Sequence, residues 1–429
     1  MGLAAGSPSV AAAPLQRPIA LVGLAVLTLI NLLNYLDRYV VAALLTDLKS
    51  AHMGLTDERL GALMSGFLVV YMIAAPIFGS IGDRGSRVRP IAIGILLWSA
   101  ATGLSGLARN YLQLLAARAA VGIGEAAYAT LAPALLADYF SRASRGRVLA
   151  VFSMAIPVGA ALGYVIGGHV DQSYGWRAAF FVASVPGLLL GVAVLGLPDP
   201  KHTRSADARP PAVPRRVVLT ALLHNRPYVL TVLGYAAYTF ALGGLAYWMP
   251  TFLQVVDGVP AAQASTRFGE IVVVTGVTGT LAGGLLGDWW LRRSREAYWW
   301  MSAWVTLLAV PLAALALSTP NPSFYFPAIV GAELLLFMSS GPVNSAIINV
   351  APAVMRASAI ALSVFTIHLL GDVPSPWLIG RLSDAHGLRV AVLIVPAAIA
   401  VSGVIWLLAG AAARGARLHA ASQAAPHSS

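Results

Sequence analysis

Twelve long apolar runs are the feature that most restricts how this chain can fold. A helix needs about 20 mostly apolar residues to cross a bilayer. Runs of that length lie approximately at 18–46, 59–82, 88–108, 111–138, 145–170, 177–198, 226–254, 265–290, 297–318, 323–350, 356–383 and 388–412. Because a backbone in lipid must satisfy its own hydrogen bonds, we predict an all-α membrane protein with twelve transmembrane helices.

The composition agrees with that prediction. Charged residues make up 10% of the chain, whereas soluble proteins carry about 25%. The net charge is +11, but the basic residues occupy short gaps between apolar runs and form no stripe with exposed aromatics, so we expect no nucleic-acid binding. There is no cysteine, which excludes disulfides, thiol catalysis and cysteine metal sites.

The distribution of Lys and Arg predicts the orientation. With twelve spans, 19 of the 28 basic residues fall on the side of the termini and seven on the opposite side. Because cytoplasmic loops carry the excess of Lys and Arg, both termini are expected in the cytoplasm. The Ala/Gly/Arg-rich composition suggests a multi-pass protein of a bacterial inner membrane.

The only long gap between spans divides the chain in two. We predict a disordered cytoplasmic N-terminus at 1–17, six-helix bundles at 18–198 and 226–412, a Pro/Arg/Ala-rich cytoplasmic linker at 199–225 and a cytoplasmic tail at 413–429. No remaining stretch is long enough for a soluble catalytic domain. We therefore expect no enzyme.

Short motifs recur in the two halves. Gly79-Ser-Ile-Gly-Asp83 ends the second run and Gly284-Leu-Leu-Gly-Asp288 ends the eighth. The fifth run carries Gly167-Gly-His-Val-Asp171, and the eleventh carries Gly380-Arg-Leu-Ser-Asp384 in the matching place. Such repeats predict two pseudo-symmetric bundles, as in transporters that rock one bundle against the other around a central site.

The first of these motifs and several other short stretches resemble a known family. The segment Gly79–Arg89, called here the signature loop, resembles the loop between the second and third helices of the major facilitator superfamily. Arg118-Ala-Ala-Val-Gly-Ile-Gly-Glu125 resembles its fourth-helix motif. Asn34-Tyr-Leu-Asp-Arg38, Glu125 itself and Ala246–Leu253 are similar to the spinster-like branch. The resemblance implies the fold of that superfamily and a bacterial spinster homologue.

The signature loop has chemistry suited to a cytoplasmic gate. Gly79 and Gly82 allow close helix approach, and Asp83 can accept hydrogen bonds from the start of a neighbouring helix. Arg84 and Arg87 follow on the same side. The alternative is a loop whose charges only set the topology. The copy in the second half lacks an arginine after Asp288, so its gating role is doubtful.

The clearest charges inside apolar runs are Asp37, Arg38, Arg118 and Glu125. A charge at the bilayer centre costs about 2.5–3.5 kcal/mol and normally faces a partner or a cavity. Arg118 and Glu125 are about 10.5 Å apart along one helix, so we expect pairs across helices, with the partners left open. The resemblance implies proton-sensitive acids tuned by the two arginines. The alternative is that Arg118 reaches the interface and Glu125 is a structural partner.

Further polar and aromatic residues are candidates for lining a substrate cavity: Asn34, Tyr71, Tyr235, Tyr238, Glu333, Phe365, His368 and Asp372. His368 and Asp372 share a helix face and form either a proton relay or a helix-stabilising pair. No third ligand accompanies them, so we expect no metal site. Charges near the ends of runs, Asp384 among them, are expected to be interfacial.

The resulting expectation is a proton-coupled secondary transporter working by alternating access. We expect a monomer that needs no cofactor beyond the proton gradient. The resemblance implies a small amphipathic, lipid-like or organic-anion substrate. One alternative is a proton-linked carrier of sugar acids, other organic anions or drugs, and another is a non-transporting membrane receptor.

Overall fold

The computed structural model describes residues 16–141, 144–199, 214–352 and 355–424, without the side chains of residues 83, 84, 215, 357 and 420–424. Within these ranges every regular element is a helix. The first half consists of α1 (Arg17–Ala43), α2 (Leu45–Ser50), α3 (Asp57–Arg84), α4 (Val88–Leu107), α5 (Tyr111–Tyr139), α6 (Arg145–Tyr174) and α7 (Trp176–Val194). The predicted disordered N-terminus lies almost wholly outside the described residues.

The second half follows the linker. It consists of α9 (Arg226–Val255), α10 (Ala261–Leu291), α11 (Ala297–Ser318), α12 (Pro322–Val350), α13 (Arg356–Ile367), the π-helical turn η3 (His368–Asp372), α14 (Pro374–His386), α15 (Leu388–Ala391) and α16 (Ile394–Ala424). Twelve helices among the described residues are long and apolar enough to cross a membrane, six in each half. The predicted twelve-helix membrane fold is confirmed.

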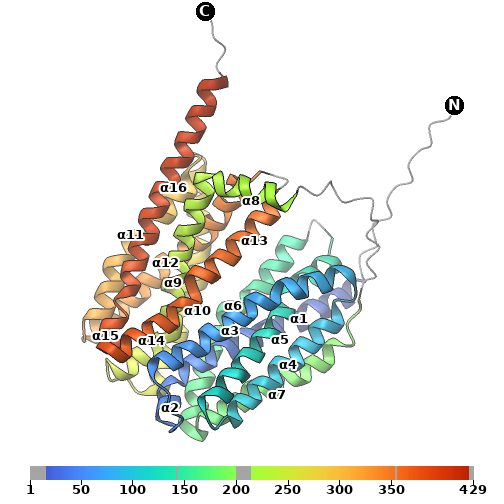
Figure 1. Ribbon diagram of the computed structural model, residues 1–429, viewed down its shortest axis with the longest axis vertical. Helices are drawn as coiled ribbons and strands as arrows, with labels where there is room; N and C mark the ends of the chain where they lie inside the picture. Colours follow the sequence, from blue (N-terminus) through green and yellow to red (C-terminus); the bar gives the residue numbers. More distant parts are fainter. Residues whose placement is uncertain (1–15, 142–143, 200–213, 353–354, 425–429) are drawn as a thin grey trace, which may run out of the picture.

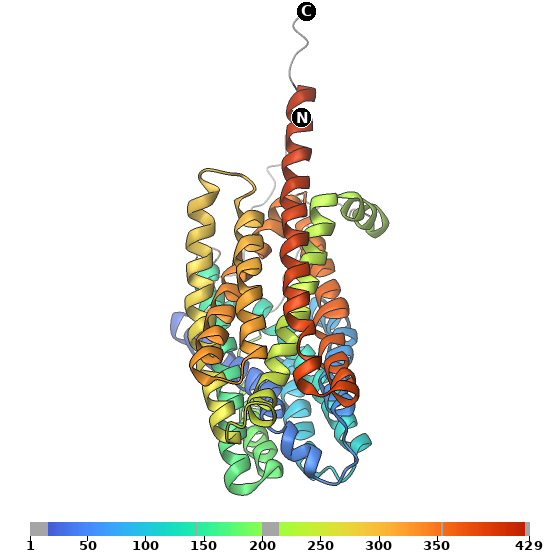
Figure 2. The same cartoon turned by 90° about the vertical axis from the view of Figure 1, so that its left-hand side faces the viewer.

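Three segments differ in detail from the expected runs. The eleventh run is interrupted by η3, directly before Pro374. Proline lacks the N–H that an α-helix needs and its ring crowds the preceding turn, so a wider turn accommodates it. Part of the linker forms α8 (Arg215–His224), while residues 200–213 lie outside the described ranges. Helix α16 continues into the predicted tail, beyond the rest of the bundle (Figure 2).

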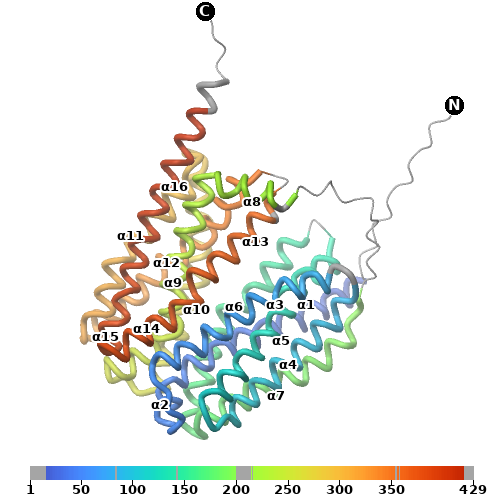
Figure 3. The backbone as a smooth tube through the Cα atoms, viewed as in Figure 1, coloured from blue at the N-terminus to red at the C-terminus, as the bar shows by residue number. Residues whose placement is uncertain are grey.

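The two halves lie side by side, and the chain passes between them once (Figure 3). Within the first half, α1 packs on α6, α3 on α5, and α4 on both α5 and α7. Within the second half, α9 packs on α16, and α12 on both α10 and α11. Contacts of α3 with α14 and of α6 with α10 join the halves.

The halves meet at the end away from the termini and diverge toward the termini (Figure 1). At the meeting end, the Tyr247 hydroxyl of α9 donates to the Leu60 carbonyl of α3 at 2.7 Å. The Ser65 hydroxyl donates to the Val373 carbonyl at 2.5 Å. This end is therefore held closed by hydrogen bonds that cross from one half to the other.

Candidate functional site

The four charges inside the first half form two ion pairs across helices. Arg38 of α1 contacts Glu125 of α5 at 2.8 Å, and Arg118 of α5 contacts Asp37 of α1 at 3.5 Å. The Thr102 hydroxyl donates to the other oxygen of Asp37 at 2.8 Å. The structure thereby selects among the pairings that the sequence left open.

Close helix packing brings these side chains together. A Cβ at Gly122 would lie 2.5 Å from the Phe67 carbonyl oxygen of α3, and one at Gly124 would lie 2.4 Å from the Gly94 carbonyl oxygen of α4. Only glycine allows backbones to approach so closely. The two glycines therefore seat α5 deep in the bundle, with Arg118 and Glu125 on its buried side.

Aromatic rings surround the Arg38 guanidinium. Its central carbon lies 4.9 Å from the ring centre of Tyr35, 5.0 Å from that of Phe67 and 5.5 Å from that of Tyr71. Rings at this distance attract a cation and exclude water from it. The side chain of Arg38 is 11% exposed while that of Glu125 is fully buried, so the pair is shielded without being sealed.

Not every polar atom of this cluster is satisfied. Glu125 Oε1 and Arg38 Nε are buried and have no hydrogen-bond partner among the described residues. A buried carboxylate oxygen without a donor is costly, and protonation is one way to relieve that cost. Chemically, Glu125 is thus a group that can take up a proton without breaking an existing bond at Oε1.

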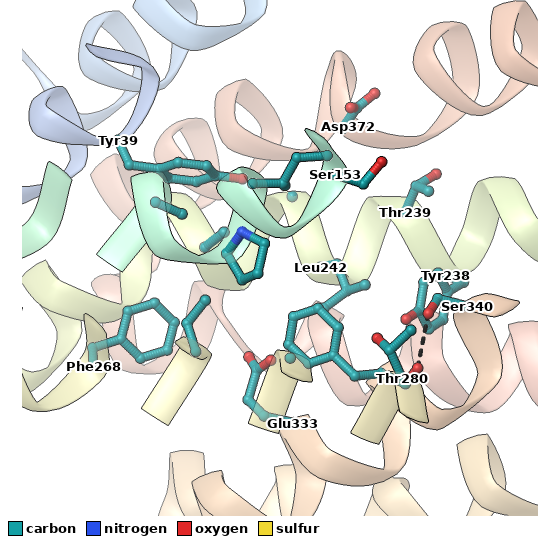
Figure 4. A pocket seen from close by; sticks show the side chains of 18 of the residues that line it. Tyr39, Ser153, Tyr238, Thr239, Leu242, Phe268, Thr280, Glu333, Ser340 and Asp372 are labelled. Atoms are coloured by element: carbon teal, nitrogen blue, oxygen red, sulfur yellow. Dashed lines mark hydrogen bonds between the residues drawn. The ribbon is translucent and has the colours of Figure 1, made fainter. Parts of the chain in front are cut away.

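A cavity of about 500 Å³ lies between the halves (Figure 4). Its wall is mostly apolar or aromatic and includes Tyr39, next to the charged cluster in the chain. Of the residues predicted to line a cavity, Tyr235, Tyr238, Glu333 and Asp372 do so. The side chain of Glu333 is buried, and its carboxylate forms no hydrogen bond or ion pair with another described residue.

The other predicted cavity residues lie elsewhere. Asn34 is buried inside the first half, and Phe365 is 45% exposed on α13; neither lines the cavity in the described chain. Tyr71 and His368 lie between the charged cluster and the cavity, with their ring centres 6.2 Å apart. His368 Nδ1 is 2.9 Å from both oxygens of Asp372, so the predicted pair forms.

These contacts connect the charged cluster to the cavity across the two halves. The Arg38 guanidinium faces the Tyr71 ring, the Tyr71 ring meets the His368 ring edge-on, and His368 reaches Asp372 at the cavity wall. A change of charge at Arg38 or Glu125 is therefore close enough to influence polar groups that a substrate in the cavity would touch.

The signature loop is only partly described. The backbone of Asp83 and Arg84 belongs to α3, but their side chains lie outside the described residues. Gly82 meets α5, where an added Cβ would collide with Leu131. Arg87 is buried and bonds the Asp138 carboxylate and, at 3.2 Å, the Ala134 carbonyl. Gly79 has room for a Cβ, since the nearest atom would be 3.6 Å away.

The sequence prediction missed a contact at the opposite end. The backbone N–H groups of Asp57 and Glu58, at the start of α3, donate to the two oxygens of Asp384 at 2.9 Å each. The Ser383 hydroxyl donates to the Asp57 carboxylate at 2.6 Å. Asp384 ends the Gly380–Asp384 motif, and the recurrence of this motif in both halves is the sequence feature that pointed to Asp384. We call this set, with Lys49 bound to Asp57 at 2.6 Å, the latch.

No group of three or more His, Cys, Asp and Glu side chains with metal-binding geometry occurs in the part of the chain that the structure describes. The expected lack of a metal remains a prediction.

Comparisons with known proteins cover most of the chain. Residues 27–371 match the family description "Major Facilitator Superfamily". The sphingosine-1-phosphate transporter SPNS2 of Mus musculus is 38% identical over 381 residues, which are 84% of this chain and 69% of that protein. Protein spinster of Drosophila melanogaster is 32% identical over 371 residues, 84% of this chain and 61% of the fly protein. The chain thus spans about two thirds of these relatives.

Solved structures show the same fold. A bacterial homologue of the human lysosomal transporter Spinster, crystallised in an inward-facing and unoccupied conformation, has a TM-score of 0.83 at 22% identity, covering 92% of this chain and 98% of its own. A D-xylose-proton symporter has a TM-score of 0.73 at 17% identity, covering 91% and 97%. At these identities the likeness concerns the arrangement of the helices.

Proposed function

Because this chain belongs to the major facilitator superfamily, and within it to the spinster-like transporters, we propose that it is a proton-coupled carrier of an amphipathic small molecule. Members of this family are transporters and not enzymes, so what remains to be proposed is the energy source and the substrate of the carrier. We further propose a monomer in a bacterial inner membrane, with no cofactor beyond the proton gradient.

The observation that carries the proton coupling is the environment of Glu125. This carboxylate is fully buried, has one arginine partner at 2.8 Å and keeps one oxygen without a donor. Protonation neutralises it and frees the charge of Arg38, which faces Tyr71 and the path to the cavity. Loading a proton would therefore weaken the α1–α5 pair and change the charge next to the substrate cavity. Asp37, paired with Arg118, is the second candidate acid.

Alternating access follows from the way the halves are joined. With the termini in the cytoplasm, as the distribution of Lys and Arg favours, the diverging end faces inward and the latch closes the outer end. The bacterial Spinster homologue of similar fold was described as inward-facing. In this view the transport cycle breaks the latch and closes the inner end, so that the cavity becomes accessible from the outer side of the membrane.

The cavity supports an amphipathic substrate more than a sugar acid. Its wall combines apolar and aromatic side chains such as Leu242 and Phe268 with a few polar groups, among them Glu333 and Asp372. Apolar walls with few placed polar groups suit a molecule with a tail and a head. Relatives carry the name sphingosine-1-phosphate transporter, and a lysolipid or a long-chain phosphate is the first substrate class to test.

The test is transport by purified protein in proteoliposomes with an imposed pH gradient. We expect Asp37→Asn and Glu125→Gln to abolish gradient-driven accumulation of a lysolipid substrate, while Glu125→Gln retains substrate exchange at equal pH, since exchange needs no net proton movement. Glu270→Gln, on an exposed side chain of α10, is the control and should transport normally. Full gradient-driven flux in both cluster variants would refute the proposal, and binding of the lysolipid without flux in the wild type would favour a receptor.

A further inference from the structure

A second cavity, of about 570 Å³, lies far from the transport site, at the end of the molecule where the termini lie. It is formed by the end of α10, the start of α11 and the extension of α16, three helices that lie side by side in Figure 2. Five arginines and one acid line it: Arg292, Arg293, Arg295, Arg414, Arg417 and Glu296. We refer to it as the arginine pocket.

The arginine pocket carries more positive charge than the described residues neutralise. Its one acid, Glu296, is buried and already bonds Arg417 at 2.8 Å. Arg293 stacks over Trp289 at 4.0 Å. Arg292, Arg295 and Arg414 are exposed and have no hydrogen-bonded or ionic side-chain partner within the described residues.

The corresponding loop of the first half is arranged differently. There Arg87 is buried and bonded to Asp138, near the end of α5. The matching helix of the second half, α12, has no Asp or Glu from residue 334 to its end at Val350. The second half therefore lacks the acid that would draw its loop arginines inward, and they remain at the surface around a pocket.

The surface beside the arginine pocket is apolar. Trp300 lines the pocket, and Trp304 and Leu308 continue its face of α11 one and two turns deeper, 53% and 58% exposed. On α10, Trp289 and Leu285 are exposed in the same way. Because these helices cross the membrane, their exposed apolar faces contact acyl chains. The pocket lies directly above them, at the depth where tryptophans mark the membrane interface.

We propose that the arginine pocket binds the headgroup of an anionic phospholipid from the leaflet on the side of the termini. Arginine forks match phosphate oxygens in two-point contacts, and basic pockets at helix ends beside lipid are typical sites for such headgroups. The three unpartnered arginines hold the phosphate, Trp300 lies against the glycerol region, and the chains follow α10 and α11. This site is separate from the transport cavity and does not depend on the proposed function.

The probe is phosphatidylglycerol added to the detergent-purified full chain, with retained lipid counted by native mass spectrometry and phosphatidylcholine as the neutral lipid. The pocket variant R292Q/R295Q/R414Q is compared with R147Q/R216Q/R226Q, which removes the same charge from exposed arginines at the same end of the molecule. Each basic residue near an anionic headgroup is worth about fivefold in affinity, so we expect about a hundredfold loss in the pocket variant.

Three results would overturn the proposal: equal loss in both triple variants, equal retention of phosphatidylcholine by the wild type, or complete displacement of phosphatidylglycerol by excess inorganic phosphate. The first result would mean that retention depends on the total charge of this end of the molecule. The second would mean that the protein retains any phospholipid, and the third that the ligand of the pocket is a free anion. Should the triple variant fail to fold, R295Q and R414Q separately carry the same comparison, each with an expected loss of about fivefold.

Discussion

The two halves of this transporter place their charges in opposite ways. In the first half, Asp37, Arg38, Arg118 and Glu125 are packed between α1 and α5 as two pairs that sum to zero. In the second half, Glu333 faces the cavity, and His368 and Asp372 are each about a quarter exposed beside it. The first half therefore keeps its charges in a buried cluster, whereas the second half presents charged groups to a molecule in the cavity.

Helix packing explains this difference. In the first half, glycines at 122 and 124 let α5 approach α3 and α4 closely, which buries Arg118 and Glu125 against their partners Asp37 and Arg38 of α1. In the second half, the π-helical turn η3 carries His368 and Asp372 at the point where the eleventh span widens before Pro374. The comparison predicts that changes in the first half cost stability, whereas changes in the second half alter what the cavity accepts.

The largest expected effect is the loss of Arg118. Arg118→Met leaves Asp37 buried with only the Thr102 hydroxyl as partner, and removing one member of a buried pair costs about 3–5 kcal/mol. Asp372→Asn, at a partly exposed pair, should cost less than about 1 kcal/mol. Thermal and denaturant unfolding in detergent measures both. The double variant Asp37→Asn/Arg118→Met should recover part of the loss, and equal costs in the two halves would contradict the comparison.

The latch is where the halves depend on each other. Asp384→Asn weakens two hydrogen bonds to a charged acceptor, each worth about 1.5–3 kcal/mol, so we expect the outer end to open in a larger share of molecules. As the sequence has no cysteine, spin labels at Tyr174→Cys and Phe324→Cys, exposed at that end in opposite halves, report the distance directly. Asp257→Asn changes the same charge within the second half and should leave the distance unchanged. An unaltered distance in Asp384→Asn would remove the latch from the mechanism.

Close backbone contact between α3 and α14 gives a steric version of the same test. A Cβ at Gly61 would lie 2.2 Å from the Pro376 carbonyl oxygen in the other half, and overpacking of this kind costs about 1–3 kcal/mol. Gly61→Ala should therefore also favour opening of the outer end, measured with the same labels. Gly79→Ala, at the other end of α3 where an added Cβ has room, should not. Opening in both variants would point to a general weakening of α3.

The smallest effect concerns Asp257, in the loop between α9 and α10. Burial raises the pKa of its carboxyl, and the Arg389 guanidinium at 3.6 Å offsets only part of that rise. A folded pKa above the unfolded one means that the stability from this group is complete below the unfolded pKa and is lost as the pH rises through the folded pKa. The melting temperature of Asp257→Asn should thus equal that of the wild type near pH 4 and be somewhat higher than that of the wild type at pH 8. A difference in melting temperature between Asp257→Asn and the wild type that shrinks as the pH rises would contradict this prediction.

Part of the site could be read from the sequence because single residues reveal it. Asp37, Arg38, Arg118 and Glu125 stand out as charges within apolar runs, where each must have a function or a partner. The twelve spans and two halves follow from the length and repetition of those runs. The Gly380–Asp384 repeat was visible as well, but its role was not, because nothing in the chain says that the start of α3 lies opposite.

The sequence by itself determined that this chain crosses a membrane twelve times, in two related bundles, with four charges buried in the first. Those features depend on local composition and on the cost of placing polar groups in lipid. Only the tertiary structure decided that Arg38 pairs with Glu125, that Asp384 holds the start of α3 and that the loop arginines of the second half surround a pocket. These contacts join residues far apart in the chain, and they are set by the rotation and depth of each helix, which glycine contacts across many helices fix together.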